Sequence, residues 1–145
     1  MARLQPETDS KTILMVDDEP DVLSVLEPLL AAEGYRVETA RDGEEALRRI
    51  QERRPDLVLL DLQMPGMGGR AVCDVLRHQP STRWLPIIVL TGRAAPAEEI
   101  GCLEHGADDF VAKPFDSREL TARIQALIRR CELGRWRPSS IPSPN

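Results

Sequence analysis

Short runs of apolar residues alternate with helical stretches along most of the chain, between Thr12 and Arg130. Three of these runs contain no charged residue, which is typical of strands that are covered on both faces. They are residues 13–16, 57–60 and 86–90. Residues 35–40 alternate between apolar and polar side chains and predict a strand with one exposed face, and residues 110–112 predict a short fifth strand.

The stretches between these strands carry apolar side chains three or four positions apart, which predicts amphipathic helices. Two helices open on an aspartate that is followed three positions later by a glutamate, the spacing of an N-terminal capping box. The pairs are Asp42 with Glu45 and Asp116 with Glu119. Gly34 predicts the end of the first helix, and Pro96 suits the first turn of the helix after the fourth strand.

Five strands alternating with five helices predict an α/β fold, a (βα)5 doubly wound parallel sheet. The uninterrupted strands belong in the middle and the alternating strand at an edge. With right-handed crossovers, this favours the strand order 2-1-3-4-5 of flavodoxin-like folds. We expect one such domain at residues 12–131, a flexible leader at 1–11 and a Pro/Ser-rich tail or linker at 132–145.

Composition narrows the range of functions. The 145 residues include 19 basic and 24 acidic side chains, and the net charge of −5 argues against nucleic acid as a direct ligand of this domain. No apolar run approaches the ~20 residues that span a bilayer, and no signal peptide is visible. We therefore expect a cytoplasmic protein without membrane contact, in which the three widely spaced cysteines are free thiols.

The residues that carry chemistry stand at the ends of the predicted strands. Asp17 and Asp18 follow the first strand, Asp61 the third, Thr91 the fourth and Lys113 the fifth. In an open parallel sheet, ligands bind beyond the carboxyl ends of the strands, where the strand order reverses. Three carboxylates there would repel one another, and a hard cation such as Mg²⁺ would relieve the repulsion. With a lysine and a hydroxyl nearby, the set describes a phosphoryl site in which a carboxylate is the nucleophile.

The chain resembles the receiver domain of a two-component response regulator over about residues 12–130. Four ordered motifs carry the resemblance: Val16-Asp17-Asp18-Glu19-Pro20, Asp61 to Gly69, Leu90-Thr91-Gly92, and Gly106 to Phe115. The resemblance implies a phosphorylation-dependent signalling switch, in which Asp61 accepts a phosphoryl group from a sensor histidine kinase or a phosphotransfer protein. Only self-phosphorylation and self-dephosphorylation are then expected, so the chain is not expected to be a true enzyme.

The resemblance also implies a metal site around the phosphoacceptor. Asp18 and Asp61 would bind Mg²⁺ directly, with the main-chain carbonyl of Gln63 as a third ligand. Asp17 would act mainly through a bound water.

A movement on phosphorylation is implied as well. Lys113 would contact the phosphoryl group, Thr91 would swing towards it, and Phe110 would move inward behind Thr91. The movement would reshape the face made by the fourth helix, the fifth strand and the fifth helix, and so control an output. Because Phe110 has no hydroxyl, its inward and outward positions would differ by packing alone.

Weak self-association through this face is a further implication of the resemblance. The positions expected to form ion pairs are Asp108, Asp109, Glu119, Arg123 and Arg130. A basic residue is usual near the start of the fourth helix, but this chain has Glu99, which would repel Glu119 and weaken the dimer. Family members also share a bend after the fifth strand, which implies a cis peptide bond between Lys113 and Pro114.

A second class of function stays open at this point, an Mg²⁺-dependent phosphatase with an aspartyl nucleophile. Phosphatases of the haloacid-dehalogenase type need an Asp-x-Asp motif after the first strand. Here the acidic pair is adjacent, and the candidate nucleophile Asp61 follows the third strand. Each site residue, taken alone, could also be a turn or surface residue. The sequence leaves open the kinase, the signal, the oligomeric state and any output domain beyond Asn145.

Overall fold

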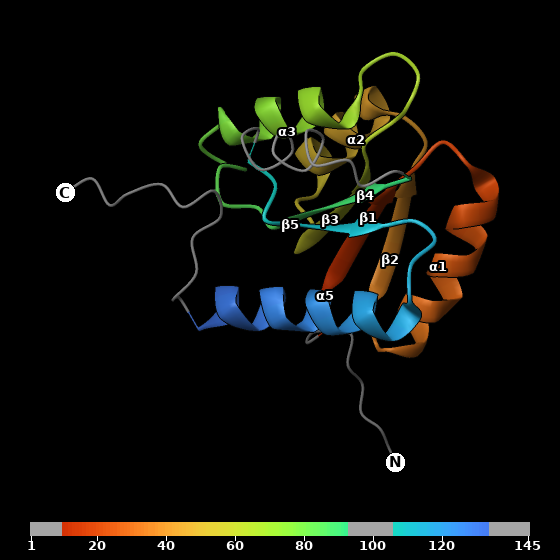
Figure 1. Cartoon of the computed structure of the whole chain (residues 1–145). Helices are drawn as coiled ribbons and strands as arrows, with labels where there is room; N and C mark the ends of the chain where they lie inside the picture. The colour runs from red at the N-terminus through yellow and green to blue at the C-terminus, as the bar shows by residue number, and fades with distance from the viewer. Residues whose placement is uncertain (1–9, 93–105, 134–145) are drawn as a thin grey trace.

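Five parallel strands form one sheet in the computed structural model, which describes residues 10–92 and 106–133 (Figure 1). The strand order is β2-β1-β3-β4-β5, so the predicted α/β fold and its doubly wound order are confirmed. The strands are β1 (Thr12–Val16), β2 (Arg36–Ala40), β3 (Leu57–Asp61), β4 (Ile87–Thr91) and β5 (Asp109–Ala112). The described helices are α1 (Pro20–Ala32), α2 (Gly43–Glu52), α3 (Gly69–Arg77) and α5 (Ser117–Glu132). The helix expected after β4, with Pro96 and Glu99, lies outside the described residues.

Helices cover both faces of the sheet, α1 and α5 on one side and α2 and α3 on the other (Figure 1). Alternate residues of β1 point to opposite faces. Ile13 and Met15 pack with α1 and α5, whereas Leu14 and Val16 pack with α2 and α3. Every residue of β3 and β4 is buried, which explains why their apolar runs are uninterrupted. The edge strand β2 is partly exposed along most of its length, as its alternating pattern predicted.

Two strands extend one residue beyond the apolar runs that predicted them. β3 ends at Asp61 and β4 ends at Thr91, because the pairing of the strands continues through both positions. Asp61 lies opposite Leu90, and Thr91 lies opposite Ala112. Backbone pairing does not depend on side-chain polarity, so a change from apolar to polar residues marks a strand end only approximately. Two candidate site residues are therefore part of the sheet rather than of the loops after it.

Both predicted helix caps are present, with one difference in detail. The Asp42 carboxylate accepts from the Glu45 backbone N at 2.8 Å, and the Glu45 carboxylate accepts from the Arg41 backbone N at 2.9 Å, one residue before the position that a standard capping box uses. The Asp116 carboxylate accepts from two backbone N–H groups at the start of α5, as an N-cap does. The Glu119 carboxylate of the second pair accepts from Arg123.

Asp108 does not have the role that the sequence suggested. It was expected to pair across a dimer, but its side chain is completely buried and accepts from Arg77 Nη2 at 3.0 Å and from the Ile87 backbone N at 2.8 Å. The expectation for Asp108 is therefore wrong, because an arginine at the end of α3 reaches it inside the chain. The neighbouring Asp109 pairs with Arg123 of α5 at 2.8 Å.

Among the described helices, none has the length and apolar character needed to cross a membrane. The leader and the tail stay predictions, since residues 1–9 and 134–145 lie outside the described part of the chain.

Candidate functional site

Three carboxylates meet at the carboxyl ends of β1 and β3. These strands are neighbours with Val16 opposite Leu60, so the residues that come next lie side by side. One carboxylate oxygen from each of Asp17, Asp18 and Asp61 lies within 4.8 Å of the other two. The residues Asp17 and Asp61 are only 1% and 4% exposed, which is unusual for charged side chains. The structure thus brings together the acidic cluster that the sequence predicted.

Lys113 reaches this cluster from the end of β5. Its Nζ donates to Asp17 Oδ2 at 3.0 Å and lies 3.6 Å from Asp61 Oδ1. The Lys113 backbone N donates to the Thr91 carbonyl at 2.7 Å, which holds the start of the loop after β5 against β4. The peptide bond between Lys113 and Pro114 is cis, as expected.

The surroundings of Asp61 and Lys113 shift the pKa of both side chains. Burial is the largest cause, and the nearby charge of Asp17 the second, of a pKa of Asp61 that is raised to about 6. Burial alone would lower the pKa of Lys113, but the hydrogen bond to Asp17 and the charges of Asp61 and Asp17 together raise it. With three carboxylates and one ammonium group, the site has an excess of negative charge. A hard divalent cation fits such a site, since the three clustered side chains offer only oxygen ligands.

Thr91 and Phe110 complete the set of predicted residues. They belong to β4 and β5, which lie beyond β3 in the strand order, on the side opposite to β1. Thr91 is the last residue of β4, one strand from Asp61, and is 3% exposed. Phe110 of β5 is partly buried and packs against the hydrophobic cluster on the α2 and α3 face. Gln63 is exposed, and its backbone N donates to Asp61 Oδ1 at 3.3 Å.

The loop after β3 brings α3 close to Asp61. A Cβ on Gly69, the first residue of α3, would lie 2.7 Å from the Asp61 carbonyl oxygen, so only glycine fits there. Gly66, earlier in the same loop, has φ of +75°, a conformation that glycine adopts without strain. The glycine-rich sequence between these elements therefore serves the tight packing of α3 on the end of the strand.

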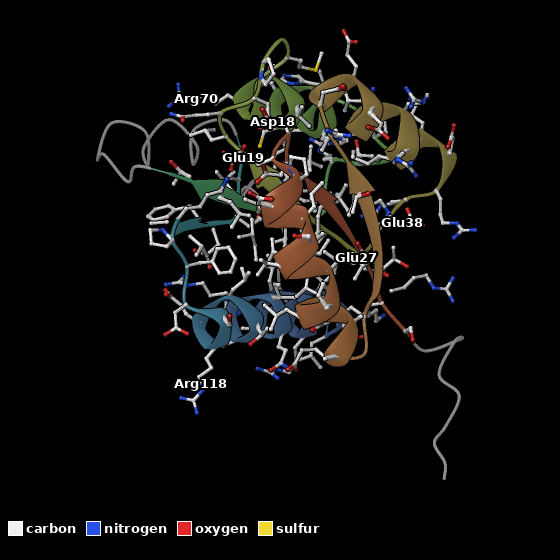
Figure 2. All side chains as sticks on the ribbon, turned by 90° about the vertical axis from the view of Figure 1, so that its right-hand side faces the viewer. Asp18, Glu19, Glu27, Glu38, Arg70 and Arg118 are labelled. Atoms are coloured by element: carbon white, nitrogen blue, oxygen red, sulfur yellow. The ribbon has the colours of Figure 1, made fainter. Side chains whose placement is uncertain are left out.

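Sequence reasoning gave no role to Glu19, although this residue was part of a quoted motif. Its Oε1 lies 3.6 Å from Lys113 Nζ, and Figure 2 shows Asp18 and Glu19 together at the N-terminal end of α1. The available signal was a third consecutive acidic residue directly after β1.

The fold and the site together define a class of protein, a small α/β domain with a buried acidic site at the carboxyl edge of its sheet. The profile of the family described as the response regulator receiver domain matches residues 13–125. The chain belongs to this family.

Individual relatives agree with this assignment. The chain is 48% identical over 126 residues to the probable transcriptional regulator ycf27 of Cyanophora paradoxa, an alignment that covers 87% of this chain and 52% of the relative. It is 44% identical over 126 residues to the DNA-binding response regulator MtrA of Mycolicibacterium smegmatis, covering 87% of this chain and 54% of the relative. The chain thus spans about half the length of the curated relatives it matches.

A solved structure provides a comparison at the site. It is the receiver domain of the sensor histidine kinase PA1611 of Pseudomonas aeruginosa PAO1, crystallised with a magnesium ion coordinated in its active site cleft. The TM-score is 0.78 at 36% identity, and the match covers 83% of this chain and 98% of that one.

These comparisons define the general function. The chain is a receiver domain of the two-component type, a signalling domain, and nothing in the comparisons favours the phosphatase that the sequence left open. Because the MtrA relative is named as a DNA-binding regulator, the comparisons do not support the expectation that the protein makes no direct contact with nucleic acid.

Proposed function

We propose that Asp61 is the phosphoacceptor of this receiver domain and takes its phosphoryl group from a phosphohistidine on a sensor kinase or phosphotransfer protein. The position of the Asp61 carboxylate supports this most directly. It is buried at the end of β3, beside the carboxylates of Asp17 and Asp18 and 3.6 Å from the Lys113 ammonium. Cations at such a site offset the charge that an incoming phosphoryl group brings.

The proposed reaction is a phosphoryl transfer between two side chains. An Asp61 carboxylate oxygen attacks phosphorus, the bond from phosphorus to the histidine nitrogen breaks, and the product is an acyl phosphate. The electron pair of the broken bond returns to the imidazole, which takes up a proton as needed. Lys113 pairs with one phosphoryl oxygen, and the Thr91 hydroxyl donates to another.

Asp18 and Asp61, with the main-chain carbonyl of Gln63, are the proposed ligands of Mg²⁺, and Asp17 acts through a bound water. The oxygen-only cluster and its excess of negative charge support this assignment. When bound, the ion supplies positive charge that offsets the charge of the phosphoryl oxygens. The magnesium ion in the PA1611 receiver domain supports the same choice of metal.

The proposed output is a change of surface around β5. Phe110 is only partly buried, so it can move further inward once Thr91 turns towards the phosphoryl group. We propose that this change regulates transcription, because ycf27 and MtrA are named as transcriptional or DNA-binding regulators and this chain spans about half of their length. Self-phosphorylation and self-dephosphorylation are the only chemistry proposed, and the proposed location is the cytoplasm.

Labelling with a small acyl phosphate tests the assignment of Asp61. Wild-type protein with acetyl phosphate and Mg²⁺ should gain at most one phosphoryl group per chain, measured by intact mass spectrometry. Asp61→Asn should gain none, because an amide is not a nucleophile for phosphorus under these conditions. Chelating the Mg²⁺ should abolish labelling of the wild type.

A matched control keeps this test specific. Asp74→Asn makes the same change at an exposed aspartate of α3 and should leave labelling unchanged. Equal labelling of Asp61→Asn and wild type would remove Asp61 as the acceptor. Release of many equivalents of phosphate from a phosphomonoester would instead favour a phosphatase.

A further inference from the structure

Lys113 contacts a carboxylate that the predicted site did not include, that of Glu19. Its Nζ lies 3.0 Å from Asp17 Oδ2, and 3.6 Å from both Asp61 Oδ1 and Glu19 Oε1. The side chains of Asp17 and Asp61 are 2% and 6% exposed, whereas that of Glu19 is 61% exposed. The ammonium group therefore lies between two buried carboxylates and one carboxylate on the solvent side.

The backbone of Glu19 holds this third carboxylate in reach. The Glu19 backbone N donates to Asp17 Oδ1 at 3.0 Å, and its carbonyl accepts from Val22 and Leu23 in the first turn of α1. Glu19 is the N-cap residue of α1, but its side chain makes no capping hydrogen bond. A poor capping residue thus occupies a cap position, and its carboxylate is directed to Lys113.

Lys113 and a metal ion compete for the same carboxylates. Asp61 Oδ1 faces the Lys113 ammonium, and Asp61 also belongs to the cluster that could hold a divalent cation. Two cations on one small cluster repel each other. An anchor on the solvent side reduces the dependence of the ammonium on Asp61, which leaves that carboxylate more available to a metal.

We propose that Glu19 is a positioning residue that draws the Lys113 ammonium towards solvent and so favours metal binding by Asp18 and Asp61. This inference rests on the metal site of the proposed function. An alternative explanation is that an acidic residue merely complements the N-terminus of α1. That explanation requires no contact with Lys113, so a test that removes Lys113 separates the two.

The test measures metal affinity without any phosphoryl donor. Mn²⁺ replaces Mg²⁺ as the probe, and free Mn²⁺ is counted by electron paramagnetic resonance at low ionic strength, with the full chain. Glu19→Gln should weaken Mn²⁺ binding about two- to fivefold, the scale of an exposed ion pair. Glu27→Gln removes the same charge from an exposed position further along α1, as Figure 2 shows, and should leave the affinity unchanged.

A double-variant comparison decides whether Glu19 acts through Lys113. In a Lys113→Met background, Glu19→Gln should no longer change the Mn²⁺ affinity, since there is no ammonium to reposition. An undiminished effect in that background would overturn the positioning role, and so would an unchanged affinity in Glu19→Gln alone. Failure of the wild type to bind Mn²⁺ at all would overturn both this inference and the metal site. Normal binding without labelling of Asp61 would overturn only the phosphoacceptor.

Discussion

At the scale of single residues, Asp17 and Asp61 are both buried, but their neighbours stabilise the two carboxylate anions to different degrees. Asp17 accepts from the Lys113 ammonium and from the Glu19 backbone N, both at 3.0 Å. The Asp61 carboxylate accepts a longer hydrogen bond of 3.3 Å from the Gln63 backbone N, and the Lys113 Nζ stays 3.6 Å away. Asp61 is therefore the less stabilised anion, a property that suits a group waiting for a cation and a phosphoryl group.

The raised pKa of Asp61 predicts how stability depends on pH in the absence of metal. Between pH of about 4 and 6, the folded state holds a proton on Asp61 that the unfolded state has already lost, so the free energy of unfolding falls as pH rises. Asp61→Asn has no carboxyl group at this position, so its free energy of unfolding does not fall for this reason. It should be more stable than wild type by about 1–3 kcal/mol at pH 7, with the difference shrinking towards pH 4.

Urea unfolding in EDTA across this pH range measures the difference. Asp74→Asn, at an exposed site, should follow the wild-type curve. Adding Mg²⁺ at pH 7 should stabilise the wild type more than Asp61→Asn, because a ligand that binds only the folded state raises its stability. If the wild type were as stable as Asp61→Asn at pH 7, the raised pKa of Asp61 would be contradicted.

At the scale of elements, two consecutive aspartates fix the start of β5 from opposite faces of the sheet. Asp108 is held by Arg77 of α3, whose guanidinium also donates to the carbonyls of Gly106 and Leu85 at 2.8 and 2.6 Å. Asp109 is held by two hydrogen bonds from Arg123 of α5. The Arg77 side chain is 7% exposed and that of Arg123 is 41% exposed. The two ion pairs therefore differ mainly in burial.

This difference predicts unequal costs for the same substitution. Arg77→Met leaves the buried Asp108 carboxylate without its cation and should lower the free energy of unfolding by about 3–5 kcal/mol. Arg123→Met breaks an exposed pair and should cost no more than ~1 kcal/mol. Urea denaturation at pH 7 compares the two variants directly. Equal costs would show that the burial of the Arg77 pair has no energetic consequence.

At the scale of the whole molecule, the remaining question is whether activation joins two copies. Asp109, Glu119 and Arg123 form one ion-pair cluster on the β5 and α5 surface, beside a shallow pocket that Arg130 also lines. Asp108 is not part of this cluster, because its buried side chain pairs with Arg77 of α3 instead. The surface left for pairing with another copy is therefore smaller than the sequence suggested, and Glu99 lies outside the described residues.

Weak self-association on activation stays a prediction. Sedimentation velocity should show a monomer without beryllofluoride, a phosphoryl mimic, and partial dimerisation with it. Asp61→Asn should not respond, because the mimic needs the same carboxylate. Glu99→Arg should tighten the activated dimer by replacing a repulsion of Glu119, each exposed pair being worth ~0–1 kcal/mol. A tight dimer without activation would contradict the switch interpretation of this face.

Much of the fold and site follows from the sequence alone, for a physical reason. Strands that are covered on both faces need uninterrupted apolar runs, whereas an edge strand can alternate apolar and polar residues. The pattern therefore indicates which strands lie in the middle of the sheet and which lies at an edge. Parallel strands also end at one edge, so Asp17, Asp61 and Lys113 converge although they are far apart in sequence. These expectations depend only on periodicity and topology, which local sequence encodes.

Only the tertiary structure decided which charged side chains come into contact. Neither the contact of Glu19 with Lys113 nor that of Arg77 with Asp108 follows from spacing, because each joins elements that are distant in the chain. Which partner a long side chain reaches depends on how closely the helices and strands pack, to within an ångström or two. The same packing placed Asp61 and Thr91 inside the sheet and buried Asp108, because backbone pairing and helix docking act regardless of whether a side chain is polar.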